Sequence, residues 1–447
     1  MPRVSPFRGL HYSLARFGDA NPAPRIALAD DEDAAPARVA DLTDVACPPY
    51  DVISDARQDK LLARDPYNAV RLELSAERDP HAAAAETMRA WVDDGTLERA
   101  VDPMAYYYRH ATPSAPDELG VEGIVVRVLL EPWGGDIRPH EHTMPGPKAD
   151  RLALLEATRT QLSPILSVYF DSSDRYRHVM SRAWADEWRA RDDDGLIHQL
   201  AAVETDERLL NYLGRQILSI ADGHHRYETA LAYQAAVRAD PRWSGAAPGD
   251  LAADWIMMML VNAELTDLEI RPTHRVLMDA DADALRTVVS GNDVLFTPIP
   301  VAPEDLADAL EERRHADEPV FGLVMPDGEG YLLVGDPDGI ADRLRRERMS
   351  SAVRSLDLAA LHVALLDDRL GISAADVAAG KRLAYTRDEA DARERVARGE
   401  AAAAILVRPT RMDQLADVAT AGDVMPQKST YFYPKLLTGM VFNPLED

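Results

Sequence analysis

The sequence predicts an α/β protein built on a mixed-sheet core, with an additional small α+β lobe. A chain of 447 residues is too long for one ordinary hydrophobic core. Apolar runs of strand length occur among helix-like segments, and the texture changes near residue 280, where segments rich in Ala, Asp, Glu and Arg begin to alternate with short apolar runs. We therefore expect a core over residues 1–280, a lobe over 281–415, and a C-terminal segment, 416–447, that returns to the core.

The elements of the first domain follow from proline positions and from apolar periodicity. Pro48 and Pro49 predict an extended backbone over Ala46 to Val52. Residues 174–196 are rich in charge and are predicted to be helical, and residues 252–262 are apolar enough for either a buried helix or a buried strand. The other predicted elements are a helix over 81–93, strands over 104–110 and 121–131, a helix over 149–160 and a strand over 166–170.

The lobe is expected to form a separate α+β unit because its predicted elements alternate in type. Its predicted helices lie over residues 281–289, 303–314, near 355–370 and 387–398. Its predicted strands lie over residues 294–298, 320–325, 331–335 and 403–407.

Composition limits the partners that the protein is expected to have. The net charge is −27, whereas phosphate backbones and anionic membranes are bound by clustered Lys and Arg, so neither a nucleic acid nor a membrane is expected. The longest apolar run, Trp255 to Ala263, is too short to span a bilayer. A single cysteine, Cys47, excludes an internal disulfide framework and predicts a reducing, cytoplasmic location. A few cations in one cleft still suffice for a small phosphorylated ligand.

The densest polar cluster is the stretch DGHHR at 222–226, which follows an apolar run and precedes a helix-like run. A strand, a glycine turn and a helix together present free backbone N–H groups, which form an anion site with the helix dipole. An arginine grips a phosphate bidentately, and an aspartate can orient a histidine or help to hold Mg²⁺. The candidates for phosphate or nucleotide binding are Asp222 (also the candidate for Mg²⁺), Gly223, His225 and Arg226, with His224 as a catalytic candidate.

A second polar segment, RPHEHT at 138–143, is predicted to lie in a loop before a helix. Glu141 stands between two histidines and is a candidate general base. His140 is a further catalytic candidate, and His142 is a candidate for substrate binding. Together with the histidines at 224 and 225, they also allow a metal site, but no tight ligand spacing of the zinc type is present.

Two further cationic segments are RPTHR at 271–275 and QKSTYFYPK at 427–435. Lys-Ser-Thr resembles the end of a P-loop, but the glycines that a P-loop requires before Lys428 are missing, so a Walker motif is rejected. A loop that offers lysines, hydroxyls and aromatic rings still suits an anion or an amino acid. The candidates are Lys428 and Lys435 for phosphate or nucleotide, and His274, Arg275, Ser429 and Thr430 for substrate.

The chain resembles the bacterial domain-of-unknown-function family numbered one thousand and fifteen in six segments, which in order are PFRGL, PPYDVIS, HEHTMPGPKADRLALLEATRTQLSPI, ADGHHRYETAL, RPTHR and PQKSTYFYPKL. The resemblance extends from Pro6 to Phe442 and so covers almost the whole chain. More distantly, ADGHHR resembles the phosphate-binding motif of the ParB/sulfiredoxin superfamily, in which a corner between strand and helix holds nucleotide phosphates. This resemblance implies a ParB/sulfiredoxin-like core.

Within that superfamily, the free serine kinases are similar to this chain in two places. Their Asp-x-His-x-Arg pattern falls on Asp222, His224 and Arg226. Their catalytic glutamate, in a His-Glu segment shortly before a helix, falls on Glu141, preceded by His140. The RPTHR and PQKSTYFYPK segments have no counterpart in these smaller enzymes. The ParB branch binds CTP and DNA, but the acidity of this chain and its lack of a basic helix-turn-helix speak against DNA.

These residues favour phosphoryl transfer on a small hydroxy amino acid, serine or O-phosphoserine, in the kinase or the phosphatase-like direction. Glu141 would take the hydroxyl proton, and the corner at 222–226 would hold the phosphates of ATP or ADP, with Mg²⁺ as a cofactor. One competing interpretation is a non-enzymatic nucleotide-binding switch that couples nucleotide binding to a partner protein. Another is a metal-dependent hydrolase centred on the histidines.

Overall fold

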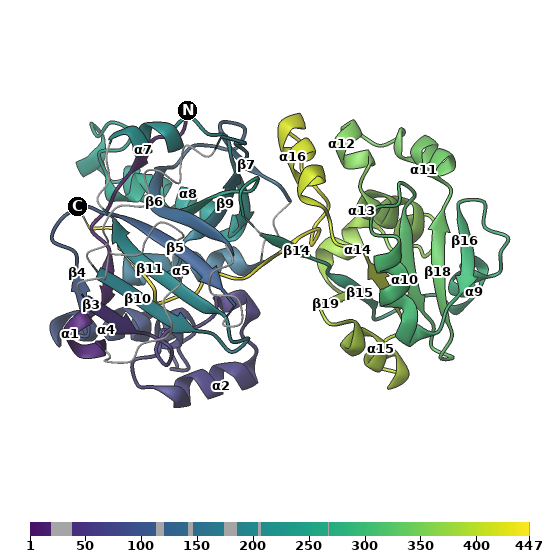
Figure 1. Cartoon of the computed structure of the whole chain (residues 1–447), viewed down its shortest axis with the longest axis horizontal. Coiled ribbons are helices and arrows are strands. Elements are labelled where there is room, and N and C mark those ends of the chain that lie inside the picture. The colour runs from purple at the N-terminus through teal and green to yellow at the C-terminus, as the bar shows by residue number, and fades with distance from the viewer. Residues whose placement is uncertain are drawn as a thin grey trace. The chain divides into compact units, whose positions relative to one another are not determined.

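The chain divides into two units, each with its own sheet (Figure 1). The computed structural model describes residues 1–18, 38–112, 120–141, 146–173, 186–203, 207–266 and 268–446. Unit 1 comprises Met1–Pro139, Pro145–Leu268 and Pro434–Asp447, and unit 2 comprises His140–Met144 and Glu269–Tyr433. The chain therefore enters unit 2 twice and ends in unit 1.

Unit 2 extends beyond the segment expected for the lobe at both ends. Two short strands, β14 (Glu269–Arg271) and β21 (Tyr431–Tyr433), pair antiparallel, with Ile270 opposite Phe432. This pairing ties the two ends of the unit together and adds residues on both sides of 281–415. Strands of three residues are too short to show an apolar period, so the sequence did not indicate the pairing.

Unit 1 is built on a mixed sheet of ten strands among the described residues. In spatial order the strands are β3 (Arg38–Asp41), β10 (Asp186–Arg191), β11 (Ile197–Val203), β5 (Ala105–Ala111), β6 (Glu122–Leu129), β13 (Trp255–Asn262), β9 (Ile165–Tyr169), β12 (Leu218–Asp222) and β7 (Ile137–Pro139), with β1 (Val4–Ser5) paired to β6. β13 runs antiparallel to β6 and parallel to β9, and β12 runs antiparallel to β9. The mixed sheet of the predicted α/β fold is confirmed.

The strand β13 is buried along its whole length. Its Met258 and Leu260 pack in one apolar cluster with Tyr227 of helix α8 (His224–Arg238). A strand that is covered on both faces has no polar side to alternate with an apolar side. The apolar run at 252–262 therefore fitted a helix and a strand equally well, and the structure makes it a strand.

Two helices of unit 1 begin at residues whose side chains cap them. The side chain of Ser54 accepts from an amide in the first turn of α2 (Asp55–Arg64), and that of Asp79 does the same for α4 (Pro80–Asp93). The predicted helix over 81–93 is confirmed as α4. The extended backbone expected over 46–52 is wrong for its last three residues, because Tyr50–Val52 form a turn of 3-10 helix after the extended Pro49. The other elements are α1 (Leu14–Phe17), η1 (Tyr50–Val52), α3 (Val70–Glu73), α5 (Gly146–Thr158), α7 (Glu207–Leu213), η2 (Pro241–Trp243), η3 (Ala252–Asp254), and the strand pairs β2 (Leu10–Tyr12) with β4 (Leu97–Arg99) and β8 (Thr160–Gln161) with β22 (Asn443–Pro444).

The prediction of a helix over 174–196 is wrong for its described part. Residues 186–191 form β10, which pairs antiparallel with β11, and residues 174–185 lie outside the described residues. The charges were misleading because two of them neutralise each other inside the sheet. Glu187 Oε2 accepts from Arg189 Nη2 at 2.6 Å, and both side chains are buried. Residues two apart lie on the same face of a strand, which brings this pair together.

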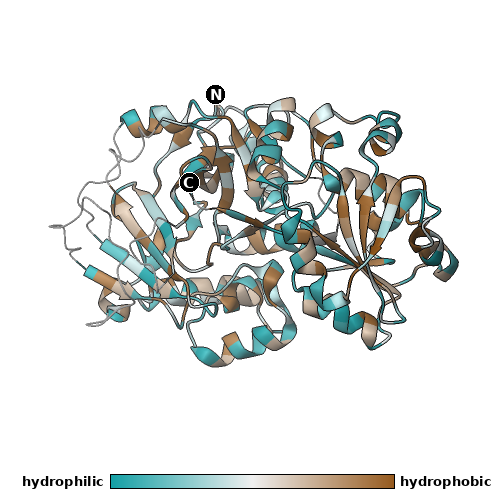
Figure 2. Cartoon of the chain, turned by 45° about the vertical axis from the view of Figure 1, so that its right-hand side comes forward, coloured by the Kyte–Doolittle hydropathy of each residue, from teal (hydrophilic) through white to brown (hydrophobic). Residues whose placement is uncertain are grey.

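Unit 2 carries a six-stranded antiparallel sheet among the described residues, and its strands are largely hydrophobic (Figure 2). In spatial order the strands are β16 (Phe296–Pro300), β18 (Gly330–Gly335), β17 (Val320–Val324), β20 (Ala403–Val407), β15 (His274–Leu277) and β19 (Leu383–Thr386). The strands predicted over 320–325, 331–335 and 403–407 are confirmed. The helices are α9 (Ala282–Val289), η4 (Pro303–Asp305), α10 (Leu306–Glu312), α11 (Pro337–Leu344), α12 (Ser351–Arg354), α13 (Asp357–Ala360), the π-helical η5 (Leu361–Asp367), α14 (Ala374–Ala379), α15 (Glu389–Ala397) and α16 (Met412–Ala421).

Two expectations from composition can be followed in the structure. The single cysteine, Cys47, is buried and has a free thiol. Within the described ranges, no helix combines the length and the apolar character that crossing a membrane requires.

Asp254 fixes α8 to the segment that precedes β13. Its completely buried carboxylate accepts from Arg238 Nε and Nη2, each at 2.7 Å, and from Gln234 Nε2 at 3.0 Å. It also accepts from the amides of Gly249 and Leu251 at 2.9 and 3.1 Å. One carboxylate thus satisfies donors from the helix and from the loop that follows it.

We expect Asp254→Ala to lower the free energy of unfolding of unit 1 by about 3–5 kcal/mol, because it leaves the buried end of the Arg238 guanidinium unpaired. Urea denaturation followed by tryptophan fluorescence measures this, since all six tryptophans fall in the residue ranges of unit 1. The control is Asp240→Asn, at an exposed pair with Arg242, which should change stability by less than about 1 kcal/mol. Equal effects of the two variants would contradict the role of Asp254.

Candidate functional site

A glycine in the left-handed region opens the candidate phosphate site. Strand β12 ends at Asp222, and Gly223 (φ 97°, ψ 27°) is the N-cap of α8, which begins at His224. A residue without a Cβ adopts this conformation at little cost. A Cβ here would also lie 3.0 Å from Nε and Nη2 of Arg226. The glycine therefore permits both the turn and the close approach of the arginine to the backbone.

Asp222, Arg226 and Lys435 form an ion network at this corner, within unit 1. The carboxylate of Asp222 accepts from Lys435 Nζ at 2.6 Å and from Arg226 Nη2 at 2.9 Å. Arg226 Nη1 also donates to Ser163 Oγ at 2.8 Å and to the carbonyl of Pro164 at 2.7 Å. The three charged side chains are only 11% to 19% exposed. Two cations therefore share one carboxylate at a place that is largely shielded from solvent.

The two cations hold Asp222 in its ionised form. Burial raises the pKa of this carboxyl, but Lys435 and Arg226 lower it by more, so that it falls from 3.8 to about 2. A carboxylate with a cation at each oxygen is a poor ligand for a third cation, whereas Mg²⁺ requires oxygen ligands that are free to approach it closely. The donor set at Asp222 therefore does not fit a directly bound Mg²⁺.

The two histidines of the corner lie in the first turn of α8. His224 is buried, and His225 is half-buried. The amide of Tyr227 donates to the carbonyl of Gly223 at 3.0 Å, whereas the amides before it belong to the first-turn N–H groups that have no acceptor within a helix. The structure thus brings one predicted set together in unit 1: Asp222, Gly223, His224, His225, Arg226 and Lys435.

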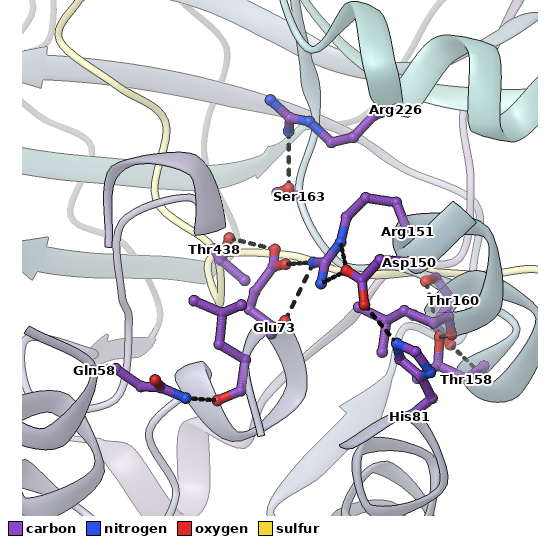
Figure 3. Close-up of polar contacts among 12 residues, drawn as sticks. Gln58, Glu73, His81, Asp150, Arg151, Thr158, Thr160, Ser163, Arg226 and Thr438 are labelled. Atoms are coloured by element: carbon purple, nitrogen blue, oxygen red, sulfur yellow. Dashed lines mark hydrogen bonds and ion pairs between the residues drawn. The ribbon is translucent and has the colours of Figure 1, made fainter. Parts of the chain in front are cut away.

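Arg226 also lines a small cavity in unit 1, which we call the Glu73 pocket (Figure 3). Glu73 Oε1 accepts from Thr438 Oγ1 at 2.9 Å, and Glu73 Oε2 accepts from Arg151 Nη1 at 3.2 Å. The sequence did not single out Glu73, because one glutamate in a short helix carries no signal until its burial is known. The polar lining of the pocket includes Tyr50, Glu73, Arg151, Ser163, Arg226 and Thr229.

The remaining predicted site residues that the structure describes lie in unit 2. His140 is buried, its Nε2 lies 2.6 Å from Thr430 Oγ1, and its ring meets that of Phe432 edge-on. Glu141 forms an isolated parallel bridge with Met425, and its Oε2 is buried with no hydrogen-bond partner among the described residues. The predicted base and the predicted phosphate corner therefore belong to different units.

The side chain of Arg275 is completely buried in unit 2. Its Nη1 donates to the carbonyl of Thr273, and its Nη2 donates to the carbonyl of Lys428 at 3.1 Å. Burial lowers the pKa of Arg275 to about 10, although Glu141 opposes this shift. Lys428 has a positive φ of 57°, which is uncommon for a residue with a side chain. Arg275 thus anchors the backbone of a strained turn.

His274 and Ser429 have hydrogen bonds within unit 2. His274 Nδ1 accepts from the amide of Val407 at 3.2 Å, and burial, together with Arg275, lowers the pKa of His274 to about 4. Ser429 Oγ donates to the carbonyl of Pro426. A neutral His274 supplies no positive charge to a substrate anion near neutral pH.

The metal interpretation finds no ligand set in the described part of the chain. His142 lies outside the described residues. Among the residues that the structure describes, no three His, Cys, Asp or Glu side chains are grouped to hold a metal ion. His140 falls in unit 2, and His224 and His225 fall in unit 1.

Comparison with known sequences identifies the family. The profile described as "Protein of unknown function (DUF1015)" matches residues 32–359, which is more than half of the chain. The chain therefore belongs to this family, as its six sequence segments predicted. No curated protein matches it.

Similar solved structures share little sequence with the chain. A free serine kinase in complex with AMP is 13% identical, with 70% of this chain and 90% of that chain covered and a TM-score of 0.36. A conserved hypothetical protein from Pyrococcus furiosus is 11% identical, with 71% and 96% covered and a TM-score of 0.36. SbnI with a C-terminal truncation, from Staphylococcus aureus, is 14% identical, with 69% and 84% covered and a TM-score of 0.33. These scores mark a distant likeness.

We expect Asp222→Asn to remove part of the acid sensitivity of unit 1. Because the folded-state pKa of Asp222 is lowered to about 2, its stabilising contribution is present above the unfolded-state pKa and is lost as the pH falls through the folded-state value. Between about pH 4 and pH 2 the wild-type chain should lose roughly 2 kcal/mol that the variant does not. Urea midpoints followed by tryptophan fluorescence across this range measure the difference.

The control for that experiment is Asp59→Asn, an exposed aspartate of α2, which should follow the wild-type curve. Parallel acid curves for wild type and Asp222→Asn would contradict the ion network at the corner.

Proposed function

We propose that the protein transfers a phosphoryl group between a nucleotide and a small hydroxy amino acid, serine or O-phosphoserine. The observation that carries the proposal is the charge arrangement at the start of α8, where two cations, Arg226 and Lys435, share the single carboxylate of Asp222. An arginine and a lysine beside the amino end of a helix favour the binding of a phosphate group. The corner thus supports a phosphate site in a protein that is strongly acidic as a whole.

One edge of the Arg226 guanidinium supports this assignment. Both Nη1 hydrogens are used, by Ser163 Oγ and the carbonyl of Pro164, and one Nη2 hydrogen goes to Asp222. The Nε hydrogen and the second Nη2 hydrogen have no acceptor among the described residues, and both nitrogens lie 3.0 Å from where a Cβ on Gly223 would stand. Nε and Nη2 form the edge with which an arginine grips a phosphate bidentately. We assign this edge to a phosphate of ATP or ADP.

In this proposal Glu141 is the general base. The assignment rests on the resemblance of the His140-Glu141 segment to the His-Glu segment of free serine kinases. Glu141 Oε2 has no hydrogen-bond donor among the described residues, which supports a role as proton acceptor. In the kinase direction, Glu141 takes the proton of the serine hydroxyl, and the hydroxyl oxygen bonds to the γ-phosphorus. The bond from that phosphorus to the β–γ bridging oxygen breaks and releases ADP. The reverse direction uses the same groups.

We expect Glu141→Gln to reduce phosphoryl transfer by about 10²- to 10⁴-fold while leaving nucleotide affinity unchanged, because the amide keeps the shape of the side chain but cannot accept the proton. Phosphorus NMR time courses measure transfer, with ATP, Mg²⁺ and serine in one sample and ADP, Mg²⁺ and O-phosphoserine in the other. Calorimetric titration with ATP measures affinity.

The outcomes of this experiment separate the competing functions. Transfer by wild type that persists in Glu141→Gln shows that Glu141 is not the base. ATP binding without transfer in either direction assigns the corner to a nucleotide-binding switch instead. Unchanged spectra together with no ATP binding remove the phosphate site itself.

We expect Lys435→Met to weaken ATP binding by about tenfold, because it removes one of the two cations of the corner and a charged interaction is worth roughly 1.5–3 kcal/mol. Calorimetric titration at fixed salt measures the affinity. Lys60→Met, an exposed lysine of α2, is the matched control and should bind ATP as wild type does. An ATP affinity that is the same in both variants would place the phosphates away from this corner.

A further inference from the structure

We infer that the Glu73 pocket binds a small zwitterion that carries a hydroxyl group, a hydroxy amino acid in its free form. The inference rests on the proposed function for the identity of this ligand as the phosphoryl acceptor. It rests on the pocket itself for the chemistry of the ligand. The pocket lies within unit 1 and is lined by side chains from six separate segments of the chain, among them those of Tyr50, Glu73, Arg151, Ser163 and Thr229.

The first observation is a buried hydroxyl with no partner. Thr229 lies within α8, is only 5% exposed, and its Oγ1 has no hydrogen-bond partner among the described residues. A threonine inside a helix usually bonds back to a carbonyl one turn earlier, and a buried hydroxyl is almost always paired. Since Oγ1 belongs to a residue that lines the pocket, a ligand in the pocket can supply the missing partner.

The second observation is an ion pair that presents both signs of charge to the same cavity. Glu73 and Arg151 are 4% and 9% exposed, and the Arg151 guanidinium also lies over the ring of Tyr50, 4.4 Å from its centroid. Its Nε and Nη2 are held by Asp150 on the other edge (Figure 3). Arg151 Nη1 donates to the carbonyl and to Oε2 of Glu73, so among the described residues one Nη2 hydrogen remains for the carboxylate of an amino acid, and the Glu73 carboxylate can accept from its ammonium.

The third observation is the position of Arg226, which touches both the corner and the pocket. Its Nη2 donates to Asp222, and its Nη1 donates to Ser163 Oγ, which lines the pocket. Ser163 Oγ accepts in that bond, so its own hydrogen remains for a ligand. A ligand with its charged ends at Glu73 and Arg151 would direct its hydroxyl toward Ser163 and Thr229. Arg226 contacts Ser163 on this side of the pocket and Asp222 at the proposed phosphate site.

The size of the pocket suits a small ligand. The cavity measures about 60 Å³, enough for a few water-sized groups. Its apolar walls come from Leu154, Leu155, Leu162 and Ile256. These walls suit the short carbon skeleton of a small amino acid and would not pair with a charge beyond its ammonium and its carboxylate.

The experiment is a calorimetric titration of the full chain with L-serine and, separately, with a non-hydrolysable ATP analogue. We expect Thr229→Val to weaken serine binding by about three- to tenfold, the effect of losing one hydrogen bond to a neutral group. Binding of the ATP analogue should stay unchanged. Thr266→Val is the matched control, since Thr266 Oγ1 is also buried and has no partner in the described part of the chain, but Thr266 does not line the pocket. Both replacements keep the size of the side chain and remove no existing hydrogen bond.

A second variant tests the ammonium end. Glu73→Gln should lower the preference for serine over glycerate, which has a hydroxyl in place of the ammonium, by about tenfold. A purely structural role of Glu73 would weaken both ligands equally, and that result would overturn the zwitterion assignment.

The remaining outcomes distinguish this inference from the proposed function. Serine affinity that Thr229→Val leaves unchanged, or ATP-analogue binding with no serine binding, overturns the pocket assignment and leaves the phosphate site standing. Serine binding that depends on Thr229, without binding of the analogue, supports the pocket and removes the phosphate site. Binding of neither ligand removes both.

Discussion

The carboxylate of Asp222 joins segments that are far apart in the sequence. It accepts from Lys435 near the C-terminal end and from Arg226 in α8, and Arg226 in turn donates to Ser163 beside β9. Taking a carboxylate out of water costs free energy, and a pair with one cation often fails to return it. Here two cations stabilise the ionised carboxylate by more than burial destabilises it, as the lowered pKa of Asp222 indicates. Because the C-terminal segment also supplies Thr438 to Glu73, the corner and the Glu73 pocket depend on the docking of the same few residues.

If the corner binds a phosphate as proposed, the same network would explain how a chain of net charge −27 can offer a site to an anion. Exposed charges are screened over about 10 Å at moderate salt. Arg226 and Lys435 act at contact distance from any phosphate at the corner, and their partial burial reduces screening by solvent. Among the described residues, the only carboxylate in contact with both of them is Asp222, and two cations at one place can favour an anion although the net charge of the chain is negative.

Sequence periodicity predicted about half of the strands in the sheet of unit 1 and four of the six in the sheet of unit 2, but not the charges inside them. The runs at 320–325 and 403–407 were found because a buried strand needs a run of apolar residues. β10 was missed because Glu187 and Arg189 neutralise each other across one strand face, and the sequence does not show burial. The residues of the candidate site also differ in whether the sequence alone points to them. The motif around Asp222 was visible as a dense polar cluster, whereas Thr229 is one hydroxyl in a helix and becomes informative only through its burial and its missing partner.

Two buried oxygen atoms without a hydrogen-bond partner among the described residues deserve a common explanation: Thr229 Oγ1 in unit 1 and Glu141 Oε2 in unit 2. Leaving a buried polar atom unpaired costs about 1–3 kcal/mol. At a site, a ligand or a chemical step can supply the missing partner. A ligand that pairs Thr229 recovers that free energy when it binds, and so stabilises the folded unit by mass action. If such a ligand binds, the free energy that the unpaired Thr229 hydroxyl costs in the free protein is recovered on binding and adds to the affinity for a molecule with a hydroxyl group.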